Sequence, residues 1–272
     1  MTDKIIICIP IKLKTRQEIA SALANKYGTD YLFIDRIFRS TVSNESCQID
    51  LSDPEAYQSG YRPMSIQPNR QKINWYLTQP RSKNVDRNLN LVDAFKIAGQ
   101  GKISESTLQQ IDGCPQVVYL TSTNTGYDSC LQMARLAVVL LNIGGIAVKV
   151  ESAGIAHSCD KWLANYNSDD PFEIYSLFVL LVEGDFYYSC GMHNFAKADV
   201  AIDLSEDIGL AIYVMNVFNY YRLTESPILQ DNHTFQPDIQ SPKYRLKWMS
   251  DSESQITTPL YNPFGRWHLF RI

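Results

Sequence analysis

Glu151, His157 and His193 are residue types that perform general acid–base chemistry, and the first two lie close together in the sequence. A carboxylate at the end of a strand and a histidine in the next turn can share a cleft and transfer protons, and His193 would complete such a site. A local interpretation competes with this one: Glu151 hydrogen-bonds the turn amides, and His157 caps the helix that Ser158 begins. The spacing favours the local interpretation. A small hydrolase-like or metal-dependent enzyme with a site near these three residues is the alternative function.

Two pairs of metal-ligand residue types, His157 with Cys159 and Cys190 with His193, could converge into a tetrahedral zinc site. The His-x-Cys spacing is unusual for zinc, and both cysteines have apolar neighbours that suit packing. We therefore expect no metal and no cofactor. The six cysteines are scattered through the chain, which is the pattern of reduced, buried thiols.

No motif of covalent catalysis is present. A cysteine nucleophile needs an electropositive setting to lower its pKa, whereas acidic residues surround Cys190 in the sequence. The chain also has no Gly-x-Ser-x-Gly elbow, no phosphate-binding glycine-rich loop and no dinucleotide fingerprint. We therefore assign no catalytic residues from the sequence.

Charge is concentrated in one segment. Residues 162–221 contain nine carboxylates and a single base, Lys197, while the whole chain has a net charge of -4. An acidic surface speeds association with a basic partner, and aromatic residues can anchor the interface. The alternative is an ordinary solvated face. The predicted partner-binding residues are Asp169, Asp170, Glu173, Asp199, Asp203, Glu206 and Asp207, together with Tyr187 and Phe195.

The elements that would position these residues fall into two strand-helix-strand units. Residues 5–11 predict a buried strand, Thr15 and Glu18 have the spacing of a capping box, Gly28 ends the helix, and residues 31–37 predict a strand. Prolines and polar residues from Ser52 to Lys83 predict a long loop. Short helices follow at 91–98 and 104–111.

The second unit begins with a strand at 116–121, a buried helix at 128–143 and a strand at 146–150. Ser158 then caps a short helix. Residues 173–182 and 186–192 predict strands joined by a hairpin at Glu183-Gly-Asp185, a helix follows at 208–221, and 244–249 and 266–270 predict edge strands. This order predicts an α+β fold with a mostly antiparallel sheet and helices packed on it. The units are 1–115 and 116–272, packed together as one globular body.

The composition is that of a globular protein. At 272 residues with 45% apolar residues, the chain can bury a sizeable core. Apolar runs are too short for a signal peptide or a membrane span, so we expect a cytoplasmic protein that makes no membrane contact. No direct nucleic-acid binding is expected. The oligomeric state is not determined by the sequence.

From about Val117 onward the chain resembles a bacterial family catalogued as domain of unknown function 4261. The resemblance lies in residues 145–157, the helix around Trp162, residues 191–195 with 198–202, and residues 262–268. It implies a relative of proteins encoded beside bacterial polymorphic toxins, and it implies no catalytic residues. With the acidic segment, it leads to the hypothesis of a cytosolic immunity protein that neutralises a basic toxin by binding it.

Overall fold

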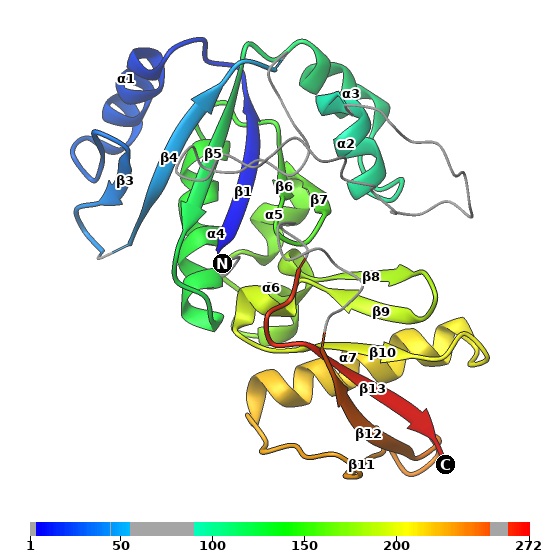
Figure 1. Ribbon diagram of the computed structural model, residues 1–272. Coiled ribbons are helices and arrows are strands. Elements are labelled where there is room, and N and C mark those ends of the chain that lie inside the picture. The colour runs from blue at the N-terminus through cyan, green and yellow to red at the C-terminus, as the bar shows by residue number, and fades with distance from the viewer. Residues whose placement is uncertain (1–3, 44, 55–89, 251–260) are drawn as a thin grey trace.

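The computed structural model describes residues 4–43, 45–54, 90–250 and 261–272. Within them the chain forms two sheets with helices packed on both (Figure 1). The α+β class with mostly antiparallel pairing is confirmed, because all but one of the strand pairs in the described residues are antiparallel. The predicted loop from Ser52 to Lys83 lies outside the described residues from residue 55 onward.

Sheet A has the strand order β2-β3-β4-β5-β1-β6-β7, with every neighbouring pair antiparallel. Its first strand, β1, lies in the interior of the sheet between β5 and β6, so the predicted boundary at 115/116 crosses a continuous sheet. The strands are β1 (Ile5–Ile11), β2 (Tyr31–Ile34), β3 (Ile37–Ser40), β4 (Ser46–Ser52), β5 (Gln116–Ser122), β6 (Ala147–Val150) and β7 (Ile155–Ser158).

Helices cover both faces of sheet A. One face packs on α1 (Arg16–Tyr27), α4 (Tyr127–Leu141), α5 (Cys159–Asn165) and α6 (Pro171–Phe178), and this is the main hydrophobic core. The other face packs on α2 (Leu91–Ala98) and α3 (Glu105–Asp112). Since strand side chains alternate between faces, Ile7 and Ile9 enter the main core while Cys8 faces α2 and α3.

Sheet B has the order β11-β12-β13-β10-β9-β8. Its strands are β8 (Leu180–Glu183), β9 (Tyr187–Cys190), β10 (Asp199–Ile202), β11 (Thr234–Phe235), β12 (Tyr244–Met249) and β13 (Arg266–Arg271). Helix α7 (Ile208–Thr224) packs on one face, and the short helix η2 (Met192–Phe195) connects β9 to β10. The prediction that the two C-terminal strands are edge strands is wrong for both, because β12 pairs with β11 and β13, and β13 pairs with β12 and β10.

Side-chain caps begin several helices where the sequence predicted them. Thr15 accepts the Glu18 N–H at 3.1 Å, and Ser158 accepts the Lys161 N–H at 3.3 Å. Each oxygen satisfies an amide that has no partner within its helix. The capping predictions for α1 and α5 are therefore confirmed.

Two strand predictions are wrong for local reasons. Residues 173–182 were expected to be one strand, but α6 occupies 171–178, because Asp170 accepts the Phe172 N–H at 2.9 Å and Pro171 takes the first helical turn. Residues 31–37 form the hairpin β2–β3, with Asp35 at φ 56° in its turn. Asp207 caps α7.

None of the described helices is both long enough and apolar enough to cross a bilayer.

The two sheets meet closely at Gly191. Its φ is +118°, and a Cβ there would lie 2.3 Å from the Phe178 carbonyl oxygen and 2.8 Å from the Ala153 methyl group. Only glycine combines this backbone conformation with such a close approach. Gly191 therefore determines how closely sheet B approaches the β6–β7 turn.

We expect Gly191→Ala to lower the free energy of unfolding by more than about 2 kcal/mol, because it adds a steric clash to an unfavourable φ. Urea unfolding measures the change. Gly101→Ala is the matched control, since Gly101 has φ +74° and nothing within 4 Å of an added Cβ. Equal costs for the two variants would contradict the close contact.

Candidate functional site

Glu151 is buried in an ion pair with Lys149. The two side chains are 0% and 4% exposed, and the Lys149 Nζ donates to Glu151 Oε2. They lie on the same face of sheet A because they are two residues apart along β6 and its end. Lys149 was not among the predicted site residues, although the Lys-x-Glu spacing in an apolar strand indicates such a pair. A buried charge needs such a partner.

The pair belongs to a polar row across sheet A. Cys8 on β1 pairs with Lys149 on the neighbouring strand β6 and with Tyr119 on the other neighbour, β5. Burial, and then the Glu151 charge, raise the pKa of the Cys8 thiol well above its usual value. A thiol in this state is a poor nucleophile. Cys159 is more exposed, and burial raises the pKa of its thiol too.

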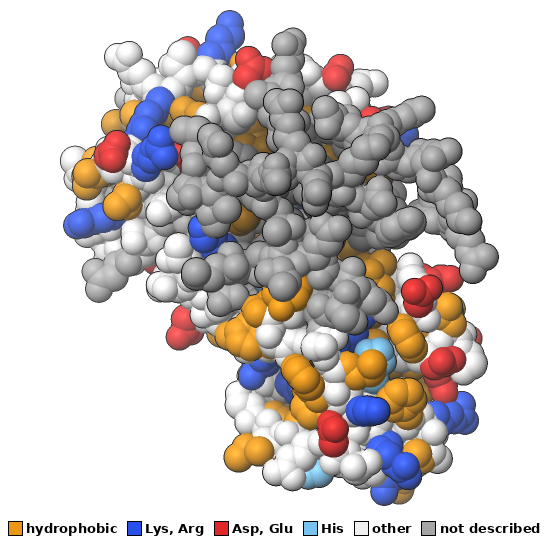
Figure 2. All heavy atoms as spheres, in the orientation of Figure 1, with side chains coloured by type: hydrophobic (Ala, Val, Ile, Leu, Met, Phe, Trp, Pro, Cys, Tyr) orange, Lys and Arg blue, Asp and Glu red, His pale blue; other side chains and the backbone are white. Residues whose placement is uncertain are grey.

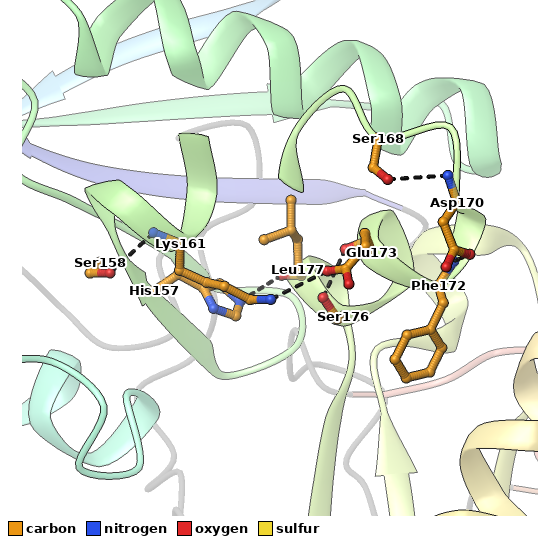
Figure 3. A network of polar contacts seen from close by, with 9 residues as sticks. All are labelled: His157, Ser158, Lys161, Ser168, Asp170, Phe172, Glu173, Ser176 and Leu177. Carbon is orange, nitrogen blue, oxygen red and sulfur yellow. Dashed lines mark hydrogen bonds and ion pairs between the residues drawn. The ribbon is translucent and has the colours of Figure 1, made fainter. Parts of the chain in front are cut away.

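His157 lies on the opposite face of sheet A from Glu151. It pairs with Val148 in the main core, and its ring packs 5.9 Å from the Trp162 ring. Figure 3 shows its Nε2 directed at the Leu177 carbonyl oxygen, 3.1 Å away. Burial lowers the pKa of His157 to about 4, so the ring is neutral at pH 7. Glu151 and His157 therefore do not share one site, and His157 does not cap α5, which Ser158 caps.

His193 is fully buried in η2, next to Asn194. Asn194 donates its Nδ2 to the Phe178 carbonyl oxygen at 3.2 Å and accepts the Ser152 hydroxyl at 2.8 Å. These contacts attach η2 to the end of α6 and to the β6–β7 turn. In the described part of the chain, no group of three or more His, Cys, Asp or Glu side chains is arranged to hold a metal ion.

Asp199 lies in the interior of sheet B, only 3% exposed, although it was predicted on a binding surface. Its carboxylate accepts the Ser189 hydroxyl at 2.9 Å, the Met192 N–H at 3.1 Å and the Asn262 amide at 2.6 Å. Burial raises the pKa of Asp199 to about 6, against the lowering effect of these donors and of Arg266. Asp199 therefore connects β9, η2 and the turn before β13.

Two more predicted surface residues are interior. Phe195 is 3% exposed and packs with its ring centroid 6.0 Å from that of Phe178. Glu206 is 9% exposed, and it receives Arg271 Nη1 at 3.3 Å and the Tyr244 hydroxyl at 3.4 Å. Apolar packing and a satisfied carboxylate explain these positions without a partner. Tyr187 is half-buried and packs against the α7 core.

The remaining acids divide into two separate groups. Asp169, Asp170 and Glu173 lie around the start of α6, where Glu173 pairs with Lys161 at 3.3 Å (Figure 3). Asp170 serves as the helix cap. Half-exposed surface pairs of this kind contribute little energy, but they neutralise charge.

The second group lies at one end of sheet B. Glu183 pairs with Tyr187, and Tyr187 pairs with Ile202, so the β8–β9 turn and the β10–α7 connection are adjacent. Neighbouring strands are about 4.8 Å apart, so the backbones of Glu183 and Ile202 are separated by about 10 Å across two strands. Four exposed carboxylates define this acidic end: Glu183, Asp185, Asp203 and Asp207.

Apolar side chains are exposed within the same segment. Leu204 is 40% and Ile208 is 51% exposed, on either side of the cap Asp207. The acidic end thus combines exposed carboxylates with exposed apolar side chains. No protein-family model matches the chain, and no significant match was found among curated proteins or solved structures.

Asp199 should make the protein less stable as the pH rises from 3.8 to above 6. Its folded-state pKa is raised, so the folded chain holds the proton more tightly, and this stabilisation is lost as the pH passes through about 6. Relative to Asp199→Asn, wild-type unfolding free energy should fall by roughly 3 kcal/mol across that range. Urea unfolding at several pH values measures it, with Asp112→Asn as an exposed control. Parallel curves for wild type and Asp199→Asn would refute the assignment.

His157 should have the opposite effect. Its folded-state pKa is lowered, so its contribution is complete above 6.5 and is lost as the pH falls through about 4. Relative to His157→Gln, wild type should lose roughly 3 kcal/mol of unfolding free energy between pH 7 and pH 4. The exposed His233→Gln is the matched control. If His233→Gln alters the pH slope as much as His157→Gln does, burial is not the cause.

Proposed function

We propose that the protein binds a basic partner protein through the acidic end of sheet B, as an immunity protein does when it neutralises a basic toxin. The observation that supports this is the strand register, which gathers Glu183 and Asp185 beside Asp203 and Asp207. The four come from segments about twenty residues apart in the sequence. The resemblance to a family whose members look like relatives of proteins encoded beside polymorphic toxins points the same way and remains a prediction.

The acidic end offers both charge attraction and apolar contact area to a partner. Its carboxylates attract a positively charged partner over roughly one Debye length, about 8–10 Å at physiological salt, and so raise the association rate. Leu204 and Ile208 offer apolar area that dehydrates on contact. A toxin whose basic active site binds nucleic acid would be occluded by such a surface.

The charges of Asp203 and Asp207 can be removed while their hydrogen bonds to the backbone are kept. Asp207 caps α7 through the Leu210 N–H at 2.9 Å, and Asp203 accepts the Ser205 N–H at 2.8 Å. Asparagine preserves both acceptors, since its side-chain oxygen also caps helices and turns. Isosteric amides therefore change charge with little change in the fold.

The test uses the proteins encoded by the genes adjacent to the gene of this one. With Glu183→Gln, Asp185→Asn, Asp203→Asn and Asp207→Asn combined, the association rate at low salt should fall about tenfold, because steering charges act on rates. Melting temperature should hardly change. Stopped-flow or surface-plasmon-resonance kinetics measure the rate, and survival of toxin-producing cells reports protection.

A control removes the same number of acids from exposed positions elsewhere and should leave the rate near wild type. Its substitutions are Asp35→Asn, Glu105→Gln, Asp112→Asn and Asp160→Asn. The proposal fails if the neighbour-encoded protein forms no complex, or if the association rate responds neither to the acidic-end substitutions nor to salt.

A further inference from the structure

Strands β12 and β13 are rich in cations and aromatic rings. Their sequences, Tyr-Arg-Leu-Lys-Trp-Met and Arg-Trp-His-Leu-Phe-Arg, contain no aspartate or glutamate. This is the reverse of the acidic segment that precedes them. The strands are adjacent and antiparallel, so their side chains form one continuous surface on each face of the sheet.

The register separates the apolar residues from the charged ones. Tyr244, Leu246 and Leu269 face α7 and belong to its core. On the other face, Arg245 lies opposite Phe270 and Lys247 lies opposite His268. We call these four residues the β12–β13 face. A row of cations on one strand thus runs beside a row of rings on the next.

The aromatic rings on this face already pack against one another. The ring of His268 lies at 84° to that of Phe186, with centroids 4.9 Å apart, and it stacks on Phe270 at 22° with centroids 6.1 Å apart. Phe270 is 43% exposed, and both Arg245 and Lys247 are exposed. Figure 2 shows basic and hydrophobic side chains next to each other, with acidic ones among them, on the lower part of the molecule, where these strands lie. Because His268 packs against one side of the exposed Phe270 ring, the Phe270 ring is held in place and can stack with a further planar group.

We propose that the β12–β13 face binds single-stranded nucleic acid, with a base stacked on Phe270 and phosphates at Arg245 and Lys247. Every base has a π-face, so stacking on an aromatic side chain needs no particular sequence. Two residues along a strand advance about 6.8 Å, of the order of the separation of successive phosphates in an extended single strand. A duplex hides its base faces and cannot stack in this way.

The proposal differs from what the net charge predicts. A net charge of -4 argues against nucleic-acid binding by the chain as a whole, but binding depends on the local field of the contact surface. With two cations, the site is small, and its affinity should fall in the range typical of non-specific binding, about 10⁻⁴ to 10⁻⁶ M. It does not rest on the proposed toxin binding, which uses the acidic end.

The experiment titrates the full chain into fluorescently labelled single-stranded RNA and DNA of about 12 nucleotides and follows anisotropy. Phe270→Ala should weaken binding at least about 5-fold, and Phe270→Trp should preserve it. Combining Arg245→Ala with Lys247→Ala should reduce the slope of log affinity against log salt from about -1.4 to near zero. These side chains are exposed, so the folds should survive, and urea unfolding of each variant verifies this.

The matched control is Arg36→Ala with Arg39→Ala, which removes two exposed cations from sheet A and should leave affinity unchanged. The proposal is overturned if wild type shows no binding at millimolar protein, or if Phe270→Ala binds as well as wild type. It is also overturned if duplex DNA or heparin binds as tightly as the single strand, since that would indicate attraction to polyanions without base stacking.

Discussion

Asn194 connects the two sheets through backbone and side-chain hydrogen bonds that leave little freedom at their junction. Its side chain joins the Phe178 carbonyl oxygen to the Ser152 hydroxyl, while its own carbonyl oxygen accepts the Gly126 N–H at 2.8 Å. A buried turn is stable only when its polar groups are bonded. Since η2 leads directly into β10, the position of sheet B, and with it the acidic end and the β12–β13 face, depends on this junction.

The buried ionisable groups oppose one another in their response to pH. As the pH falls from 6 to 4, Asp199 gains stabilising protonation while neutral His157 loses its advantage over the unfolded chain. Because the two effects have similar size and opposite sign, they offset each other across mildly acidic pH. The Lys149–Glu151 pair compensates its own charge in sheet A. Burial and pairing therefore explain how these ionisable residues are accommodated in the framework.

Local signals in the sequence predicted most helices and strands, but they did not predict which strands pair over long sequence separations. Caps such as Thr15 and Ser158 act through residues three positions away, so their effect is readable from spacing. The insertion of β1 between β5 and β6 depends on contacts more than a hundred residues apart, for which no local pattern exists. The same limit applies to the site. The acidic segment was identified, but its members could not be assigned to inside or outside, although Asp199 in an apolar strand carried a signal of burial.

Because the acidic end and the β12–β13 face carry opposite charges on one sheet, binding at one affects binding at the other. Asp203 follows Ile202, which pairs with Leu269, so the acidic end begins next to Phe270 and lies about one Debye length from the cations of β12. Its carboxylates must weaken the attraction of a phosphate chain to Arg245 and Lys247. A basic partner bound at the acidic end would remove that repulsion, and by linkage a bound single strand would then strengthen the partner's binding by the same factor. Charge segregation within one sheet is thus sufficient to couple the two proposed surfaces without any change of conformation.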